Sequence, residues 1–411
     1  MVNLITLNNG LRIVYHPDKT RHKTGFSICL NVGSINERRT KNSLIKGIAH
    51  FTEHLMFKSN EQKHYEELYK SLGWKGTNYN AETGLCHTNF YGSTKSSIED
   101  VLETFYEAYT FSDYNCEEFE NEKKVVLNEI LEHESTVKNI MTYKLLIPSL
   151  YQNTRLSRNI VGDTRLFKKI NLEDIKKFKK KFYTPKNTVI GLTGNFDMRS
   201  LKPFLERTFG SLEPSKKNTS RFNPKLSPFY GSIIKNLPGI IPSTHLMTAF
   251  LAPRETDKNY ILADFLNDIL SLDYSSRMNL ELREKRGIGY KLGVEYDESY
   301  GYLCFYVDNF LPEQLAEAKD AINTFIEDIL LKGISHEEID GVKELVISHY
   351  LSDESDLVSL AKSLTEQEAF KLPYNITDIE KKLKRVTPYQ LNRFAKKLFR
   401  QNKLEIIVNS T

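Results

Sequence analysis

The chain has 411 residues, more than one hydrophobic core usually organises, so two domains are expected. Apolar residues make up 40% and charged residues 27%, as in soluble globular proteins, and a net charge of +4 gives no support for nucleic acid or membrane as a partner. No apolar run is long enough to span a bilayer, no signal peptide is visible, and the four cysteines form no Cys-x-x-Cys pair. These features favour a cytoplasmic protein with free thiols.

The hydrophobic pattern changes repeatedly between strand-like and helix-like periods along the first half of the chain. Strands are predicted over 4–15, with a hairpin at Asn8-Asn9-Gly10, and over 24–32, 83–91 and 187–193. Helices are predicted over 47–57, 63–72, 97–110, 116–134 and 172–182. Strands and helices are mixed without the regular alternation of a doubly wound parallel sheet, so the predicted fold class is α+β.

The second half of the chain contains a similar segment. Residues 382–406 repeat the apolar spacing of residues 166–190, with Phe394 in the place of Phe178. The two segments lie half a chain length apart, which predicts two homologous domains, each an antiparallel-dominated sheet packed with helices. The alternative is a chance match between two amphipathic helix–strand units, which are common. The predicted division is a first domain over 1–212, a linker rich in Pro, Lys, Asn and Ser over 213–227, and a second domain over 228–411.

One short helix carries a candidate metal site. Residues 47–57 contain His50, Glu53 and His54 in the order His-x-x-Glu-His. On a helix, Glu53 and His54 fall within about 60° of His50, and the apolar residues of the segment fall on the opposite face. Two histidines at i and i+4 suit one tetrahedral zinc ion, and the glutamate can take a proton from zinc-bound water. The alternative is a solvated helix face with no ligand.

The third ligand is expected from the helix predicted over 116–134, which carries Glu122, Glu129, Glu132 and His133. Glu122, Glu129 and His133 share a helix face with the apolar residue Val126, where an unpaired charge would cost several kcal/mol. A metal ion or a basic partner would remove that cost, although a wet acidic face without a role is the alternative. Spacing alone does not choose between Glu129, Glu132 and His133. The second domain has Asp-x-x-Asn-Asp near the equivalent of the zinc motif, so one zinc ion per chain is expected.

The motif and its downstream glutamate resemble the insulinase/pitrilysin family of zinc peptidases, whose His-x-x-Glu-His order inverts the thermolysin type. The resemblance implies that His50, His54 and Glu129 bind zinc and that Glu53 is the general base. It also implies that Glu122, seven residues before the third ligand, supports the metal site. The expected fold and reaction are therefore those of a zinc metalloendopeptidase.

Other stretches resemble family motifs as well. Asn80 and Ala81 match a segment next to the edge strand that holds substrate, although Glu82 stands where the family usually has an aromatic residue. Arg283 and Tyr290 match a motif that contacts the substrate or the oxyanion. Further matches are the opening strand at 7–13 and a Gly-Ser-x-x-Glu turn formed by Gly33, Ser34 and Glu37.

The length matches two-domain members of the family, similar to the mitochondrial processing peptidase, rather than the four-domain members that close around a chamber. The resemblance therefore implies a homodimer, or a heterodimer with a related subunit, in which Arg283 and Tyr290 act on their own or the partner's site. The expected function is hydrolysis of short or unfolded peptides. Two alternatives are a non-catalytic partner subunit of the same fold and a basic surface at Lys176–Lys181. For the latter, a solvated helix face is the preferred interpretation.

Overall fold

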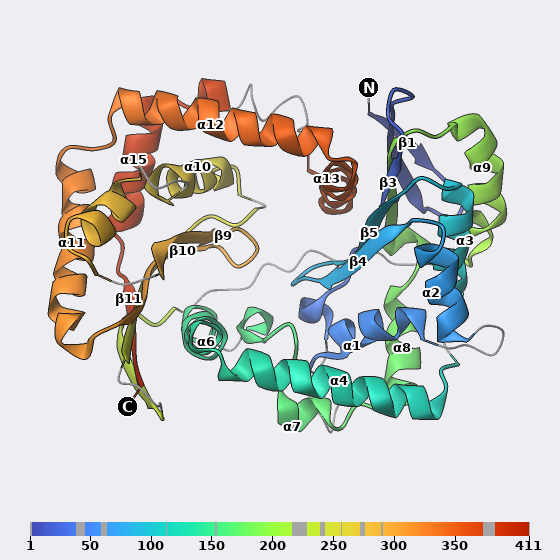
Figure 1. The fold of residues 1–411 in the computed structure, drawn as a ribbon, viewed down its shortest axis with the longest axis horizontal. Helices are drawn as coiled ribbons and strands as arrows, with labels where there is room; N and C mark the ends of the chain where they lie inside the picture. The colour runs from blue at the N-terminus through green and yellow to red at the C-terminus, as the bar shows by residue number, and fades with distance from the viewer. Residues whose placement is uncertain are drawn as a thin grey trace. The chain divides into compact units, whose positions relative to one another are not determined.

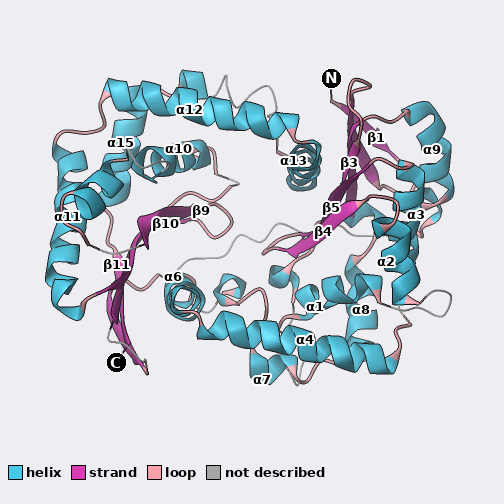
Figure 2. Ribbon diagram, viewed as in Figure 1, coloured by secondary structure: helices cyan, strands magenta, loops and turns pink. Residues whose placement is uncertain are grey.

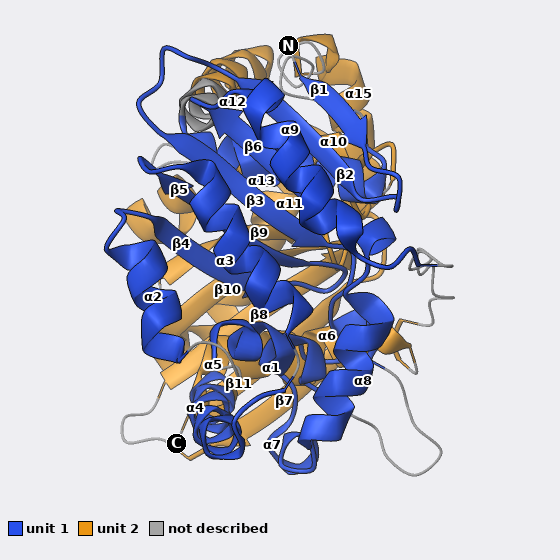
Figure 3. Cartoon of the chain, turned by 90° about the vertical axis from the view of Figure 1, so that its right-hand side faces the viewer, with its two compact units in different colours: residues 1–133, 158–223, 351–376 blue, residues 134–157, 224–350, 377–411 orange. Residues whose placement is uncertain are grey.

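The chain forms two compact units, each assembled from three separate segments (Figure 3). Unit 1 consists of Met1–His133, Arg158–Asn223 and Leu351–Ile376, and unit 2 of Glu134–Ser157, Pro224–Tyr350 and Thr377–Thr411. A computed structural model describes residues 2–37, 46–58, 64–111, 113–152, 154–215, 228–238, 243–255, 257–271, 276–288, 291–372 and 383–410. Most of the linker predicted over 213–227, and Tyr290, lie outside the described residues.

Unit 1 is built on a six-stranded sheet in the order β1-β2-β6-β3-β5-β4, of which Figure 1 labels β1, β3, β5 and β4. Neighbouring strands are antiparallel except β2 and β6, which are parallel. The free strand at one edge is β4, which pairs with β5 alone among the described strands. The strands are β1 Asn3–Thr6, β2 Arg12–Pro17, β3 Thr24–Leu30, β4 Asn78–Thr83, β5 Thr88–Thr94 and β6 Thr188–Gly194.

Helices cover both faces of this sheet (Figure 2). Alternate strand residues point to opposite faces, so Ile28 joins the main core while its neighbour Cys29 packs in a second, smaller cluster. This burial on both faces explains why all residues of β3 are buried. The helices that precede the linker in unit 1 are α1 Ile48–His54, α2 Tyr65–Gly73, α3 Ile98–Thr110, α4 Cys116–Ser135, α7 Thr164–Phe167, α8 Leu172–Phe182 and α9 Met198–Arg207.

The smaller cluster forms where α13 (Leu357–Phe370), a helix from the second half of the sequence, packs on β3 and β6. Two glycines permit the close approach. A Cβ at Gly25 would lie 2.3 Å from the Leu357 carbonyl oxygen, and one at Gly191 would lie 2.5 Å from Thr365 Cγ2. The helix is also held by a buried ion pair, in which Arg12 Nη1 lies 2.8 Å from Glu368 Oε1.

Replacing Glu368 with alanine is expected to lower the free energy of unfolding by about 3–5 kcal/mol, because it leaves the buried Arg12 guanidinium without its carboxylate. Chemical denaturation measures the difference. The control is Lys371→Ala, which removes an exposed partner of the same carboxylate and should cost less than about 1 kcal/mol. Equal losses in the two variants would contradict the role assigned to the buried pair.

Unit 2 repeats the topology of unit 1. Its five-stranded sheet has the order β7-β11-β8-β10-β9, which corresponds to β2-β6-β3-β5-β4, and again only the pair of the first two strands is parallel. The prediction of an α+β fold with two similar, mainly antiparallel sheets is therefore confirmed. The elements are β7 Gly231–Leu237, β8 Ser243–Leu251, β9 Lys291–Asp297, β10 Tyr302–Phe310, β11 Leu404–Ser410, α10 Tyr260–Ser271, α11 Leu315–Leu331, α12 His336–Ser355 and α15 Pro388–Phe399.

Each unit also contains a segment from the other half of the sequence. The α13 segment completes unit 1, and a helical segment of unit 2, comprising α5 Val137–Asn139, the π-helical η3 Ile140–Leu146 and α6 Ile147–Leu150, comes from the first half. Within unit 2, η3 contacts β11. The compact units thus differ from the contiguous ranges 1–212 and 228–411 in these two exchanged segments.

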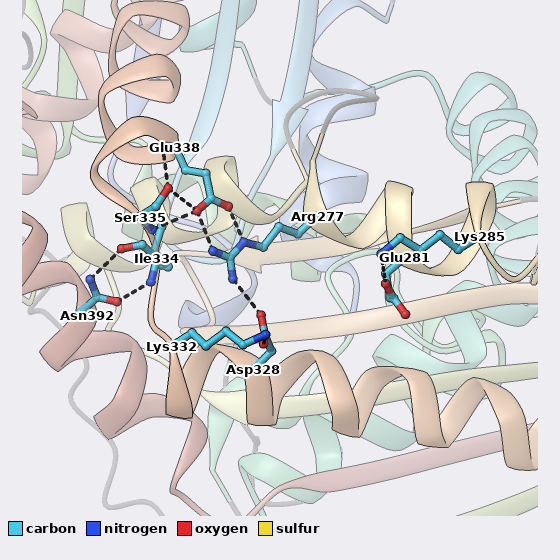
Figure 4. Close-up of polar contacts among 9 residues, drawn as sticks. All are labelled: Arg277, Glu281, Lys285, Asp328, Lys332, Ile334, Ser335, Glu338 and Asn392. Carbon is cyan, nitrogen blue, oxygen red and sulfur yellow. Dashed lines mark hydrogen bonds and ion pairs between the residues drawn. The ribbon is translucent and has the colours of Figure 1, made fainter.

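Polar contacts fix the segment of unit 2 that carries Arg283. Arg277 Nη2 lies 2.6 Å from Glu338 Oε2, and Asn392 exchanges two hydrogen bonds with the backbone of Ile334 (Figure 4). The Arg277 bond connects the residues just before η7 (Asn279–Glu284) with α12, and the Asn392 bonds connect α15 with the residues just before α12. The Arg277 contact thus anchors the start of η7, on which the Arg283 side chain is exposed.

The element predictions agree with the structure in the helices and fail at one hairpin. The helices predicted over 97–110, 116–134 and 172–182 are α3, α4 and α8. The strand predicted over 83–91 is correct only in part: residues 88–91 belong to β5, but residues 84–87 form the turn between β4 and β5, and Asn78–Thr83 is itself a strand. Within the described part of the chain, no helix has the length and apolar character that crossing a membrane requires.

Candidate active site

The His-x-x-Glu-His segment forms α1, which is only two turns long and packs by one side on the core of unit 1. Ile48, Ala49 and Phe51 are buried there, and the following 3-10 turn, η2 Leu55–Phe57, adds further apolar contacts. His50, Glu53 and His54 lie on the other side of the helix, as the helical spacing predicts. His50 is only 7% exposed, so its imidazole lies in a largely dry environment.

The longer helix α4 brings a carboxylate to the two histidines. Glu129 Oε1 lies 3.4 Å from His50 Nε2, and Glu129 Oε2 lies 3.4 Å from His54 Nε2. The two imidazole Nε2 atoms are 3.2 Å apart. Of the three residues between which spacing did not choose, Glu129 is therefore the one that reaches the histidines, while Glu132 is exposed and His133 lies 3.5 Å from Asn159.

These three contacts have the dimensions of a zinc site. With zinc–ligand bonds of about 2.0–2.2 Å and tetrahedral angles, neighbouring ligand atoms are separated by about 3.3 Å. The observed separations of 3.2–3.4 Å between His50, His54 and Glu129 agree with this value. Two His nitrogens and one carboxylate fit zinc, and three protein ligands leave a fourth position for water or substrate, as in catalytic zinc sites.

The protonation of the two histidines differs. Burial, together with the charge of His54, lowers the pKa of His50 to about 4. Burial also acts to lower the pKa of His54, but hydrogen bonds to Glu122 and Glu129 and the charge of Glu53 outweigh it and raise that pKa to about 9. A metal ion at this site would therefore displace a proton from His54, and its binding would weaken in acid.

A second carboxylate orients one of the histidines. Glu122 Oε1 lies 2.9 Å from His54 Nδ1, and Glu122 Oε2 lies 2.6 Å from Lys58 Nζ. Because Glu122 accepts a hydrogen bond from the Nδ1–H group of His54, the neutral imidazole directs its Nε2 lone pair toward Glu129 and His50. Lys58, which follows η2, was not singled out from the sequence; only its position four residues after His54 links it to the motif.

Replacing Glu122 with glutamine is expected to weaken zinc binding by about 10–100-fold, because the amide has a single acceptor oxygen and cannot accept from both His54 and Lys58. Competition with a chromogenic chelator measures the affinity. Glu120→Gln, an exposed neighbour on the same helix, is the matched control and should bind zinc as the unaltered protein does. An unchanged zinc affinity in the Glu122→Gln variant would show that the contact between Glu122 and His54 is dispensable.

The general-base candidate is held by the edge strand of the sheet. Thr83, at the end of β4, donates a hydrogen bond of 2.9 Å to Glu53 Oε2. Burial raises the pKa of Glu53, which makes the carboxylate a better proton acceptor. Thr83 was not predicted as a site residue. Asn80 and Ala81 lie on the same strand, where Asn80 Oδ1 accepts a hydrogen bond from the Ala81 amide.

Glu82, which replaces the family's usual aromatic residue, belongs to a different set of contacts. Glu82 Oε2 lies 2.9 Å from Lys362 Nζ of α13, and Glu82 Oε1 lies 3.8 Å from His87 Nε2. Glu366 is 4.0 Å from the same imidazole. These side chains resemble a metal cluster in composition, but the ammonium group among them already balances Glu82, so the His50 cluster is the better metal site.

The two remaining predicted residues are not part of the described cluster. Arg283 lies in unit 2, with Nε 4.0 Å from Glu284 Oε1, and Tyr290 lies outside the described residues. Their contact with substrate or oxyanion stays a prediction.

Comparison with known proteins agrees with the fold and the motif. The family model described as "Insulinase (Peptidase family M16)" matches residues 12–164, and the model described as "Peptidase M16 inactive domain" matches residues 169–346. The first match contains the His50 cluster and the second contains Arg283 and Tyr290. The repeated α+β unit with one His-x-x-Glu-His helix defines the two-domain class of inverted-motif metallopeptidase folds.

The chain belongs to the insulinase family, peptidase family M16, with the half-length architecture of that family. It is 26% identical over 407 residues to an uncharacterized zinc protease of Bacillus subtilis, covering 98% of this chain and 97% of that one. It is 25% identical to a probable mitochondrial-processing peptidase subunit beta of Arabidopsis thaliana, covering 62% and 48%. The crystal structure of a protease from Helicobacter pylori superposes with a TM-score of 0.89 at 20% identity, covering 99% of each chain.

Proposed function

We propose that this chain is a zinc-dependent endopeptidase that hydrolyses short or unfolded peptides. The observation that carries the proposal is the mutual spacing of 3.2–3.4 Å between His50 Nε2, His54 Nε2 and the Glu129 carboxylate. Such groups lie this close only with a shared proton or a cation between them; without a metal the proton of His54 fills this role, and a bound zinc ion would replace it. The names of the zinc protease relatives support the same metal.

When bound, zinc supplies Lewis-acid chemistry, lowering the pKa of water and polarising a carbonyl oxygen. Glu53 accepts the proton of the attacking water and then gives it to the leaving amine. The hydrogen bond from Thr83 fixes the Glu53 carboxylate during these transfers. Glu122 holds the His54 tautomer that presents Nε2 to the metal.

The edge strand β4 offers a place for an extended peptide. Its outer backbone groups have no partner strand among the described residues, so a substrate strand can pair with Asn80 and Ala81. Main-chain pairing is tolerant of sequence, which suits a range of peptides. Arg283 and Tyr290 would then contact the substrate or the oxyanion, within the chain or from a second copy in a homodimer.

The second candidate is a non-catalytic partner subunit. The match of residues 169–346 to a model described as an inactive domain, and the similarity to one subunit of a processing peptidase, favour it. In that case the protein would form a heterodimer with a related chain and would cleave nothing alone. Intact ligands and an intact general base in unit 1 favour the peptidase.

The decisive experiment is incubation of the purified protein with a mixed peptide library, followed by mass spectrometry of the products. Cleavage is expected without additives, to stop with a chelator, and to return when zinc is restored. Cleavage that persists in a His54→Ala variant would indicate a contaminating peptidase. No cleavage by a zinc-loaded, folded protein would favour the non-catalytic subunit.

A further inference from the structure

The two candidate zinc-binding histidines are positioned by different means. His54 is oriented by the carboxylate of Glu122 at its Nδ1 atom. His50 Nδ1 is buried and has no hydrogen-bond partner among the described residues. Apart from the contacts of its Nε2 atom with Glu129 and His54, the direction of the His50 imidazole therefore comes from the placement of the helix backbone and from packing, so the position of the start of α1 matters.

The start of α1 cannot cap itself. Its N-cap residue is Gly47, which has φ +85° and no side chain to accept a hydrogen bond from the first helical amides. A larger residue does not fit, because a Cβ there would lie 2.7 Å from the Val161 carbonyl oxygen and 3.1 Å from Gly162 Cα. Close backbone packing thus requires glycine at the position where helices usually carry a capping side chain.

The side-chain carboxyl group of Glu37, ten residues earlier in the chain, supplies the missing acceptor. Glu37 Oε1 accepts hydrogen bonds from the amides of Gly47, at 3.0 Å, and Ala49, at 3.2 Å. The amide of the second helical residue is one that an N-cap side chain usually satisfies, and Ala49 occupies that position next to His50. Glu37 is 1% exposed, and its own carbonyl oxygen accepts a hydrogen bond from Arg158.

We infer that Glu37 is a positioning residue of the metal site, whose side-chain carboxyl group caps the metal-binding helix from outside and thereby sets the place of His50. The inference rests on the proposed function, since it assumes a metal ion between His50, His54 and Glu129. The hydrogen bonds of the Glu37 side chain within the described part of the chain go to the backbone of Gly47 and Ala49, not to the ligand atoms or to the strand β4, along which a peptide is proposed to bind; Glu37 therefore acts through the backbone of α1. The two histidines thus depend on two glutamates, Glu122 through a side chain and Glu37 through the helix terminus.

The test uses cobalt(II) as a spectroscopic probe for the metal, so that it does not depend on peptidase activity. Glu37→Ala is expected to weaken cobalt binding by about 10–100-fold and to change the visible bands of the tetrahedral ion, because His50 is misplaced. Glu37→Gln keeps an acceptor oxygen for the two amides and is expected to restore both affinity and spectrum to nearly those of the unaltered protein.

The matched control is Asp197→Ala, which removes the exposed N-cap of α9, where Asp197 Oδ1 accepts from the Arg199 amide at 2.9 Å. It should lower the melting temperature without changing the cobalt spectrum. If Glu37→Ala does not fold, Glu37→Asp, whose shorter side chain cannot reach both amides, is expected to show the same loss to a smaller degree. Unchanged cobalt binding in the Ala and Asp variants, or an equal loss in Asp197→Ala, would overturn the inference. Failure of the unaltered protein to bind cobalt would instead overturn the proposed function.

Discussion

Glu53→Gln is expected to remove peptide hydrolysis while the protein still binds zinc. The amide keeps the size of the side chain and its contact with Thr83 but cannot accept a proton from the attacking water. The loss in kcat should be about 10²–10⁴-fold, the usual contribution of a positioned acid–base group. Initial rates on a peptide identified from the library measure it.

The zinc content of Glu53→Gln, measured by elemental analysis, is the control for this experiment. One zinc per chain together with lost activity assigns the defect to proton transfer. Full activity in a zinc-loaded Glu53→Gln preparation would show that another group is the general base. Loss of zinc from the variant would show that Glu53 supports the metal site itself.

Glu129→Gln is expected to weaken zinc binding by more than about a hundredfold, because a neutral amide replaces the carboxylate that reaches the Nε2 atoms of both histidines. Activity at limiting zinc should fall in parallel. The measurement is chelator competition, followed by activity at increasing zinc concentration.

Glu132→Gln is the matched variant for this prediction, since Glu132 lies on the same helix, three residues further on, with an exposed side chain. It should bind zinc as the unaltered protein does. The assignment of the third ligand would be wrong if Glu132→Gln lost zinc and Glu129→Gln retained it.

Helices with a clear apolar stripe were predictable from the sequence, because burial of one face against a core determines both their pattern and their position. The helices α8 and α15, which lead into β6 and β11, show this in both units. The strand β4 was missed because Asn78, Asn80 and Glu82 are poor strand formers. Pairing with β5, the next strand along the chain, overrides that local preference.

The site was predictable to the extent that its residues lie on single helices. His50, Glu53 and His54 share one face of α1, which follows from helical periodicity alone. The choice of Glu129 could not be made from spacing, because it depends on how α4 packs beside α1. Lys58, Thr83 and the cap by Glu37 are also tertiary contacts, and no local pattern indicates them.

The exchange of α13 and the segment of η3 between the two units has a consequence for how the protein is made. During synthesis, all six strands of the unit 1 sheet are present once β6 has emerged. One face of the sheet lacks its covering helix until α13, which begins at Leu357, is synthesised. A truncated product that ends at the linker would therefore expose an apolar surface over Val14, Cys29 and Val189. Neither half of the gene is expected to yield a well-behaved protein when it is expressed alone.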